Sequence, residues 1–311
     1  MSAPQTDTKA RHYAEPVPTL KMLLGDYPKT RPIRDGAVAP RLFTLDIADI
    51  PVAQNGFKPL VRQNAFDVSE VAIITGLQAI DNGKPYALLP FVMNGAFHHG
   101  SVLYNVASGV RAPKDLEGRK IGMRAYTQTT PTWVRGFLAE DYGVDLSTIR
   151  WVTFEDAHVA EYVEPSNCER APAGAKLQDM LINGEIAAAF IAQAVDDPRV
   201  APLIPNPAEA AKAWHAKHQA VPINHMFCVR KELIEERPDI VAEVFDLLIQ
   251  SRTASGGGGL KDGIDLQPYG LAKVANALEI VLRYAYDQKL VSKRYDIEDL
   301  FGPVTAALGA K

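Results

Sequence analysis

A regular alternation of strand-like and helix-like segments between residues 120 and 192 constrains the fold more than any other feature of the sequence. Short apolar runs indicate strands, and apolar residues repeated at intervals of three and four indicate helices. The expected strands and helices alternate in the order 120–123, 128–143, 149–154, 175–183 and 186–192. Helices between successive strands favour a parallel sheet, so we expect an α/β fold.

The segments on either side of this region indicate a second sheet. Apolar runs before it predict strands at residues 20–24, 43–50, 66–73 and 86–92. After it, residues 221–231 predict a strand that returns the chain to the first part, and helical periodicity follows. Two crossings would act as a hinge. We therefore expect two discontinuous lobes and an N-terminal arm: a mobile arm of residues 1–18, a first lobe of residues 19–118 and 221–311, and a second lobe of residues 119–220.

The composition disfavours several classes of function. The chain has 311 residues, 47% hydrophobic and 23% charged, which is enough for two globular domains. Its formal net charge of −4, with scattered lysines and arginines, disfavours nucleic-acid and membrane partners and favours a small-molecule ligand. The sequence has no run that suits a signal peptide or a membrane span, so we expect a cytoplasmic protein. The alternative is a mature periplasmic protein that has lost its leader.

The expected helix at residues 128–143 begins in a way that suits an anion. Thr129 and Thr130 are good capping residues, and Pro131 suits the first helical turn. The start of a helix leaves backbone N–H groups free and carries partial positive charge, so a carboxylate or phosphate would be stabilised there. The alternative is a surface helix with an ordinary cap.

Several segments together resemble the 4,5-dihydroxyphthalate decarboxylase family. They run from about Leu20 to Phe301 and include GDYPKTRPIRDG, FDVSEVA, AFHHGSVLYN, WVRGFLAEDYGV, MLINGEI, PINHMFCVR and QPYGLAKVANALEIVLRYAYDQKL. The segment VRAPKDLEGRKIGM also resembles the passage between lobes in type II periplasmic-binding-protein folds. The resemblance implies a two-lobed α/β fold with a ligand cleft between the lobes. It also implies loss of carbon dioxide from an electron-rich aromatic acid, either without a cofactor or assisted by a metal.

Two histidines and a glutamate are the candidate catalytic residues. Decarboxylation of a phenolic acid needs a donor that protonates the ring carbon, and a histidine suits this role near neutral pH. His99 and His225 follow expected strands in segments that match the family, so we expect them to face one cleft. Glu70 would orient or deprotonate a partner. The alternatives are histidines bonded to backbone carbonyls and a salt bridge from Glu70 to Arg31 or Arg34.

The candidate substrate-binding residues are polar side chains at expected strand ends and at the helix start. They are Asp26, Arg31, Ser69, His98, Ser101, Tyr126, Thr129, Thr130 and Arg135. Arg135 could instead project into solvent. Three histidines and a glutamate could hold a divalent metal, but their spacing follows no ligand motif, so no metal site and no cofactor are predicted. Cys168 and Cys228 are far apart and match no metal-binding motif.

The sequence also departs from the family pattern. Gly95, His98 and Gln193 stand where we expect family arginines, and Ala187 stands where we expect an acid. A doubly charged phthalate favours bidentate arginine partners, so a monocarboxylate is the expected ligand. Two functions remain open: a carboxy-lyase for a hydroxylated aromatic acid, and a solute-binding receptor of the ABC-transporter type that binds without turnover. A homo-oligomer is compatible with either function.

Overall fold

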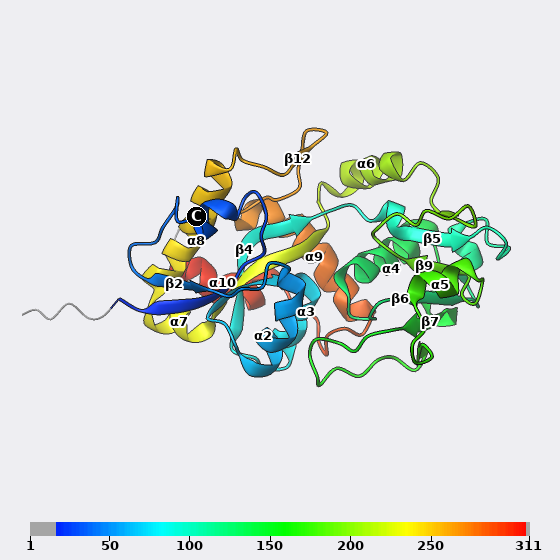
Figure 1. Cartoon of the computed structure of the whole chain (residues 1–311), viewed down its shortest axis with the longest axis horizontal. Helices are drawn as coiled ribbons and strands as arrows, with labels where there is room; N and C mark the ends of the chain where they lie inside the picture. Colours follow the sequence, from blue (N-terminus) through cyan, green and yellow to red (C-terminus); the bar gives the residue numbers. More distant parts are fainter. Residues whose placement is uncertain (1–16, 309–311) are drawn as a thin grey trace, which may run out of the picture.

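The computed structural model describes residues 17–308 and shows an α/β molecule with two main sheets (Figure 1). The expected arm therefore falls almost entirely outside the described residues. Figure 1 shows the first sheet at one end of the molecule and the second sheet at the other, with α4 and α9 between them. Within the described part of the chain, no helix combines the length and apolar character that a membrane crossing requires.

The first sheet has five strands in the order β2-β1-β3-β11-β4. The strands β1, β2 and β3 are parallel, whereas β11 runs antiparallel to both β3 and β4. The late strand β11 thus lies in the middle of a sheet that is otherwise built from the N-terminal part of the chain. The bounds are β1 (Thr19–Leu23), β2 (Thr44–Ile47), β3 (Val68–Ala72), β4 (Tyr86–Gly95) and β11 (Ile223–Arg230).

The second sheet has six strands in the order β10-β5-β9-β6-β7-β8. The strands β9, β6, β7 and β8 are parallel, and β5 and β10 are antiparallel additions at one edge. The bounds are β5 (Val102–Asn105), β6 (Lys120–Met123), β7 (Arg150–Thr153), β8 (Cys168–Arg170), β9 (Ala188–Phe190) and β10 (Val200–Pro202). A separate hairpin consists of β12 (Leu260–Lys261) and β13 (Ile264–Asp265).

Helices cover both sheets, and α4 shows how the sequence defines one of them. Trp133, Val134 and Leu138 are almost fully buried at helical spacing, and Gly143 ends the helix in the left-handed conformation with a φ of 65°. The helices are α1 (Arg31–Arg34), α2 (Phe57–Gln63), α3 (Ile73–Asp81), α4 (Thr129–Tyr142), α5 (Leu177–Ile182), α6 (Pro207–His218), α7 (Lys231–Glu236), α8 (Pro238–Ala254), α9 (Leu271–Asp287) and α10 (Ile297–Leu308).

The sheet membership of β5 corrects one expectation. The sequence placed residues 102–105 in the first lobe, but β5 pairs with β9 and β10 of the second sheet. The reason is packing, because Leu103 is buried in the same apolar cluster as Leu181 and Ile186. The first crossing therefore lies between Gly95 and Val102, well before the expected boundary at residue 119.

Two sets of contacts join the parts of the molecule that carry the two sheets. At the crossings, His98 Nε2 donates to Asn224 Oδ1 at 2.8 Å, and the backbone N–H of Ala96 donates to the carbonyl of Pro222 at 3.0 Å. On another side, the loop between β7 and β8 contacts α2, because Arg62 donates to the carbonyls of Ala157 and His158. The two sheets are thus braced against each other at more than one point.

Candidate active site

A buried carboxylate–histidine pair lies on two neighbouring strands of the first sheet. Glu70 of β3 lies opposite Phe227 of β11, so His225 is its diagonal neighbour on the same face. The His225 Nδ1 atom lies 2.6 Å from Glu70 Oε1, and the Glu70 side chain is fully buried. The hydroxyl of Tyr27 also donates to Oε1 at 2.9 Å, and the N–H of Gly25 donates to Oε2 at 3.2 Å.

These donors keep the Glu70 carboxylate ionised. Burial alone would raise the pKa of Glu70, but the hydrogen bond and charge of His225, with the donors from Tyr27 and Gly25, lower that pKa below its usual value. An ionised carboxylate only accepts hydrogen bonds, so the His225 Nδ1 atom must carry the proton between them. The opposite ring nitrogen, Nε2, makes no hydrogen bond within residues 17–308 and can exchange a proton with a ligand.

Aromatic rings hold the His225 side chain in place. The ring of Phe57 meets the His225 ring edge-on, with centroids 5.2 Å apart and an interplanar angle of 81°. Phe57 is itself fully buried, so the contact restricts rotation of the imidazole. Glu70 and Phe57 together fix which side of the imidazole is left for a ligand.

Tyr27 and Lys29 complete this cluster and were not among the predicted site residues. Lys29 is only 6% exposed, and its Nζ atom lies 5.5 Å from the centroid of the Tyr27 ring. Burial lowers the pKa of Lys29 to about 8, although the nearby Glu70 carboxylate opposes this effect. Burial also raises the pKa of Tyr27, with further increases from Glu70. The sequence feature that could have identified them is their position directly after the first strand, because loops at this position hold ligands in open α/β sheets.

A cavity of about 460 Å³ lies at the start of α4 in the second lobe. The first turn of α4 has no side-chain cap, and the buried Oγ1 atom of Thr129 has no partner among the described residues. Arg124 lines the cavity and is only loosely paired with Glu155, at 3.7 Å. Other lining residues are Gln128, Thr130, Phe154, Lys176 and Gln193. Two acidic residues, Glu155 and Asp179, also line the cavity, so its side chains are balanced in charge. The free helix N–H groups, with Arg124 and Lys176, are the groups that would suit an anion there.

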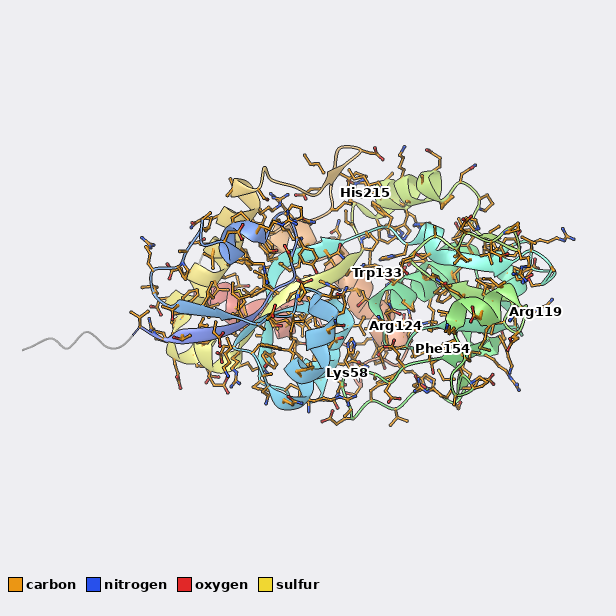
Figure 2. All side chains as sticks on the ribbon, in the orientation of Figure 1. Lys58, Arg119, Arg124, Trp133, Phe154 and His215 are labelled. Carbon is orange, nitrogen blue, oxygen red and sulfur yellow. The ribbon has the colours of Figure 1, made fainter. Side chains whose placement is uncertain are left out.

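His158 interacts both with Arg124 of the cavity and with His225 of the carboxylate–histidine pair. Its Nδ1 is hydrogen-bonded to Thr75 Oγ1 at 2.8 Å, and its ring meets Phe57, the same ring that contacts His225. Burial first, and then the charges of Arg124, Lys58, Arg62 and His225, lower the pKa of His158 to about 4. Figure 2 shows Arg124 and Phe154 on the second-lobe side of this junction and Lys58 on the first-lobe side. The pair and the cavity therefore border the same junction between lobes.

Arg135 and Tyr126 are structural, contrary to their predicted role in substrate binding. Arg135 is fully buried, and its Nε atom donates to Gln288 Oε1 at 2.7 Å. Its guanidinium lies 3.9 Å from the centroid of the Tyr126 ring and donates to the Tyr126 carbonyl. The reason is the packing of α4, whose Arg135 face is covered by β6 and by the end of α9. Arg135 projects neither into solvent nor toward the cavity.

His98 and His99 are buried, but each has surroundings different from those of His225. Burial lowers the pKa of both to about 4. His98 bonds Asn224 at the crossing, whereas His99 stacks on Phe137 with centroids 4.4 Å apart. His99 lines a separate cavity of about 280 Å³ with residues of α6 and the β12–β13 hairpin. The expectation that His99 and His225 face one cleft is therefore not what the structure shows.

The remaining predicted residues have other partners. Ser69 is fully buried and donates to the carbonyl of Glu70 at 2.6 Å, so it does not reach a ligand. Asp26 and Arg31 form an ion pair at 3.2 Å, and both side chains are more than 40% exposed. The predicted alternative for Glu70, a salt bridge to Arg31 or Arg34, is not formed because Glu70 pairs with His225. Ser101 is buried beside His99, away from the Glu70 pair.

The structure explains one departure from the family pattern, Gly95, and places another, Gln193, in a cavity. A Cβ atom at Gly95 would collide with the carbonyl oxygen of Leu266, so no side chain fits there without a backbone shift. Gln193 lines the cavity at the start of α4. Within residues 17–308, no group of three or more His, Cys, Asp or Glu side chains is arranged to hold a metal ion.

Comparison with known proteins confirms the resemblance that the motifs indicated. The chain is 28% identical to the 4,5-dihydroxyphthalate decarboxylase of Comamonas testosteroni, over 92% of this chain and 97% of that protein. It is also 28% identical to the 4,5-dihydroxyphthalate decarboxylase of Pseudomonas putida, over 63% of this chain and 81% of that protein. No protein-family model matches the chain.

Solved structures confirm the two-lobed periplasmic-binding-protein-like fold. The alkanesulfonate-binding protein SsuA from Xanthomonas axonopodis pv. citri has a TM-score of 0.55 and 15% identity, covering 94% of this chain and 98% of that one. The aliphatic sulphonate-binding protein SsuA from Escherichia coli has a TM-score of 0.52 and 12% identity, with 91% of each chain covered. The desulfurization enzyme DSZB has a TM-score of 0.51 and 14% identity, covering 94% and 99%. Binding proteins and an enzyme thus share this fold, so the fold alone does not decide between them.

Proposed function

We propose that this relative of the 4,5-dihydroxyphthalate decarboxylases is a carboxy-lyase that removes carbon dioxide from a hydroxylated aromatic acid bound between the lobes. The observation that carries the proposal is the buried Glu70–His225 pair, in which Glu70 holds Nδ1–H and Nε2 has no partner among the described residues. A receptor needs donors that match its solute, but it does not need a buried ionised carboxylate behind a histidine. Such a pair is the arrangement that orients a general acid or base.

In the proposed reaction, His225 is the general acid. The imidazolium, stabilised by Glu70, donates the Nε2 proton to the ring carbon that bears the carboxylate, while the ring hydroxyl supplies electron density. The bond to the carboxylate then breaks, carbon dioxide leaves, and the bonding electron pair restores the aromatic ring. The product has hydrogen in place of the carboxylate, and His225 regains its proton from solvent. Tyr27 and Gly25 keep Glu70 ionised throughout, because both donate to it.

The substrate carboxylate would bind in the cavity at the start of α4. The free N–H groups of the first turn and Thr130 supply donors, and Arg124 supplies a positive charge that its loose contact with Glu155 leaves available. Thr129, whose buried hydroxyl has no partner among the described residues, adjoins this lining. Hydrogen bonds to a charged group contribute about 1.5–3 kcal/mol each. These contacts stabilise the carboxylate in the substrate but are lost when it leaves as neutral carbon dioxide, so this site orients the acid more than it drives the chemistry.

The proposed function can be tested by measuring both the release of carbon dioxide and the binding of the acid. The wild type should release carbon dioxide from a mono- or dicarboxylated catechol, with 3,4-dihydroxybenzoate and 4,5-dihydroxyphthalate as the first two candidates. His225→Gln and Glu70→Gln should each lower kcat by about 10²–10⁴-fold, because a positioned general acid contributes that much. Calorimetric binding of the same acid should change only a few-fold. His218→Gln is the matched control, since His218 lies on α6 against Trp214.

Two outcomes would contradict the proposal. Wild-type kcat in both His225→Gln and Glu70→Gln would exclude the acid role. Tight binding of aromatic acids by the wild type with no release of carbon dioxide would favour the receptor function instead.

A further inference from the structure

The Lys29 side chain is largely buried beside the Glu70–His225 pair, and its amino group makes no hydrogen bond to the residues that the structure describes. Lys29 is 6% exposed, and within residues 17–308 its Nζ atom makes no hydrogen bond and no ion pair. The nearest charged groups are Glu70, which is bonded to His225, and Arg252 and Asp265, which pair with each other at 2.8 Å. Most of the Lys29 side chain is removed from water, and the Nζ atom is not among the fully buried atoms that lack a partner, so it keeps an opening through which a ligand could reach it. A largely buried ammonium group without a hydrogen bond is costly, so its retention calls for an explanation.

The backbone that carries Lys29 is held rigidly in the loop between β1 and α1. The Thr30 hydroxyl donates to the carbonyl of Gly25 at 2.6 Å and accepts from the N–H of Tyr27 at 2.9 Å. The hydroxyl of Ser251 on α8 donates to the carbonyl of Lys29 at 2.6 Å. A backbone segment held by hydrogen bonds from two neighbouring parts of the chain is typical of a preorganised binding group and not of a solvated surface lysine.

The neighbours of Lys29 indicate which ligand atom it would meet. Tyr27 lies beside Lys29 and also donates to Glu70, so Lys29 and the catalytic pair share one wall of the site. In the proposed reaction, the ring carbon lies at His225 and the carboxylate lies toward α4. The ring hydroxyls are the remaining polar groups of such a substrate, and an ammonium group stabilises a hydroxyl in its ionised, electron-donating form.

We propose that Lys29 is a specificity-determining residue whose ammonium group binds the ionised ring hydroxyl of the aromatic acid. The inference rests on the proposed function for the identity of the ring, but not on turnover. The Lys29 ammonium donates the hydrogen bonds that no described residue accepts, and the ionised ring hydroxyl accepts them. An acid that lacks the hydroxyl, or carries a methoxy group there, would leave the buried ammonium unpaired.

Binding measured by calorimetry tests this proposal independently of catalysis. The probes are 3,4-dihydroxybenzoate, its 3-methoxy and 4-methoxy derivatives, and benzoate. The wild type should bind the dihydroxy acid at least tenfold more tightly than benzoate and than one of the two methoxy acids. Lys29→Met should weaken binding of the dihydroxy acid about 10- to 100-fold and change benzoate binding less than twofold. Lys21→Met is the matched control, because Lys21 is an exposed lysine on the adjoining strand β1.

A stability measurement separates ligand binding from a structural role. Because the ammonium has no hydrogen bond or ion pair within residues 17–308, the Tm of Lys29→Met should equal or exceed that of the wild type. A clear fall in Tm with hydroxyl selectivity intact would overturn the proposal, as would a wild type that binds hydroxylated and plain acids equally. If decarboxylation is absent but hydroxyl selectivity depends on Lys29, the catalytic proposal fails and the Lys29 proposal stands.

Discussion

The guanidinium group of Arg135 stabilises the contact between α4 and the end of α9. It donates to Gln288 Oε1, to the Tyr126 carbonyl and toward Thr132 Oγ1, all of them buried. Arg135→Met should lower the free energy of unfolding by about 3–5 kcal/mol, because each buried acceptor left unpaired costs about 1–3 kcal/mol. Urea unfolding measures the change, and the KM of the folded fraction should stay near the wild-type value. A raised KM with unchanged stability would restore the ligand-binding role first expected for Arg135.

Some residues of the candidate site could be predicted from the sequence, and others could not. Glu70 and His225 could be named as candidates, because each lies in a strand segment that resembles the decarboxylase family. Their hydrogen bond to each other was not predicted, because it depends on how β3 pairs with β11. Lys29 was not named, because the charged groups near its side chain include Arg252 and Asp265, which lie far from it in the sequence. Arg135 was predicted wrongly for the same reason, since the neighbours that bury it belong to β6 and the end of α9. Burial of a long charged side chain is a tertiary property that local spacing does not encode.

The start of α4 carries a buried hydroxyl that does not stabilise the helix end, and our proposal assigns this end to ligand binding. Thr129 Oγ1 is buried without a partner, whereas Thr132 Oγ1 donates to the carbonyl of Gln128 at 3.0 Å. Thr129→Val should therefore leave stability unchanged or raise it by up to about 1 kcal/mol, because it removes an unsatisfied hydroxyl at nearly constant volume. It should also weaken binding of the aromatic acid about tenfold. Calorimetry and urea unfolding report the two effects separately.

Thr132→Val is the matched control for this prediction. Its loss of a hydrogen bond should destabilise the protein by about 1 kcal/mol and leave ligand affinity nearly unchanged. If Thr129→Val destabilises the protein and binds the acid normally, the start of α4 is an ordinary helix end and the anion site lies elsewhere.

The elements themselves were largely predictable, but their assignment to sheets was not. Helical periodicity and Gly143 predicted α4, and the short apolar run at residues 120–123 predicted β6, because both patterns are local. β5 was assigned to the wrong lobe, because a strand of four residues carries no sign of which sheet it will join. Its partners β9 and β10 come about a hundred residues later, and pairing with them decides its place.

At the scale of the whole molecule, neutral histidines brace the junction between lobes. His98 joins the two crossings through Asn224, and His158 joins the β7–β8 loop to α3 through Thr75. Desolvation first, and for His158 the charges of Arg124, Lys58, Arg62 and His225 as well, lower the pKa of both histidines to about 4. These contacts at the junction therefore depend on uncharged imidazoles.

This dependence predicts how stability changes with pH. The pKa of each histidine in the folded protein, about 4, is below its ordinary value of 6.5, so the unfolded chain binds more protons between these values. The stability that each contributes is complete above pH 6.5 and is lost as the pH falls toward 4, by about 2–3 kcal/mol per histidine. Urea unfolding between pH 7.5 and 4.5 should show this decrease in the free energy of unfolding. Protonation of Glu70, whose pKa is lowered, contributes to the decrease only at the acidic end of this range.

A single variant isolates the contribution of the junction. His158→Asn keeps a side chain that can bond Thr75 but cannot titrate, so its stability should fall less steeply between pH 6.5 and 4.5 than that of the wild type. His215→Asn is the control, because His215 bonds the Ala220 carbonyl within the segment that follows α6. Equal pH slopes in His158→Asn and the wild type would show that protonation of His158 does not govern the junction. A shallower slope accompanied by weaker ligand binding would show that the same contact also sets the closed state of the cleft.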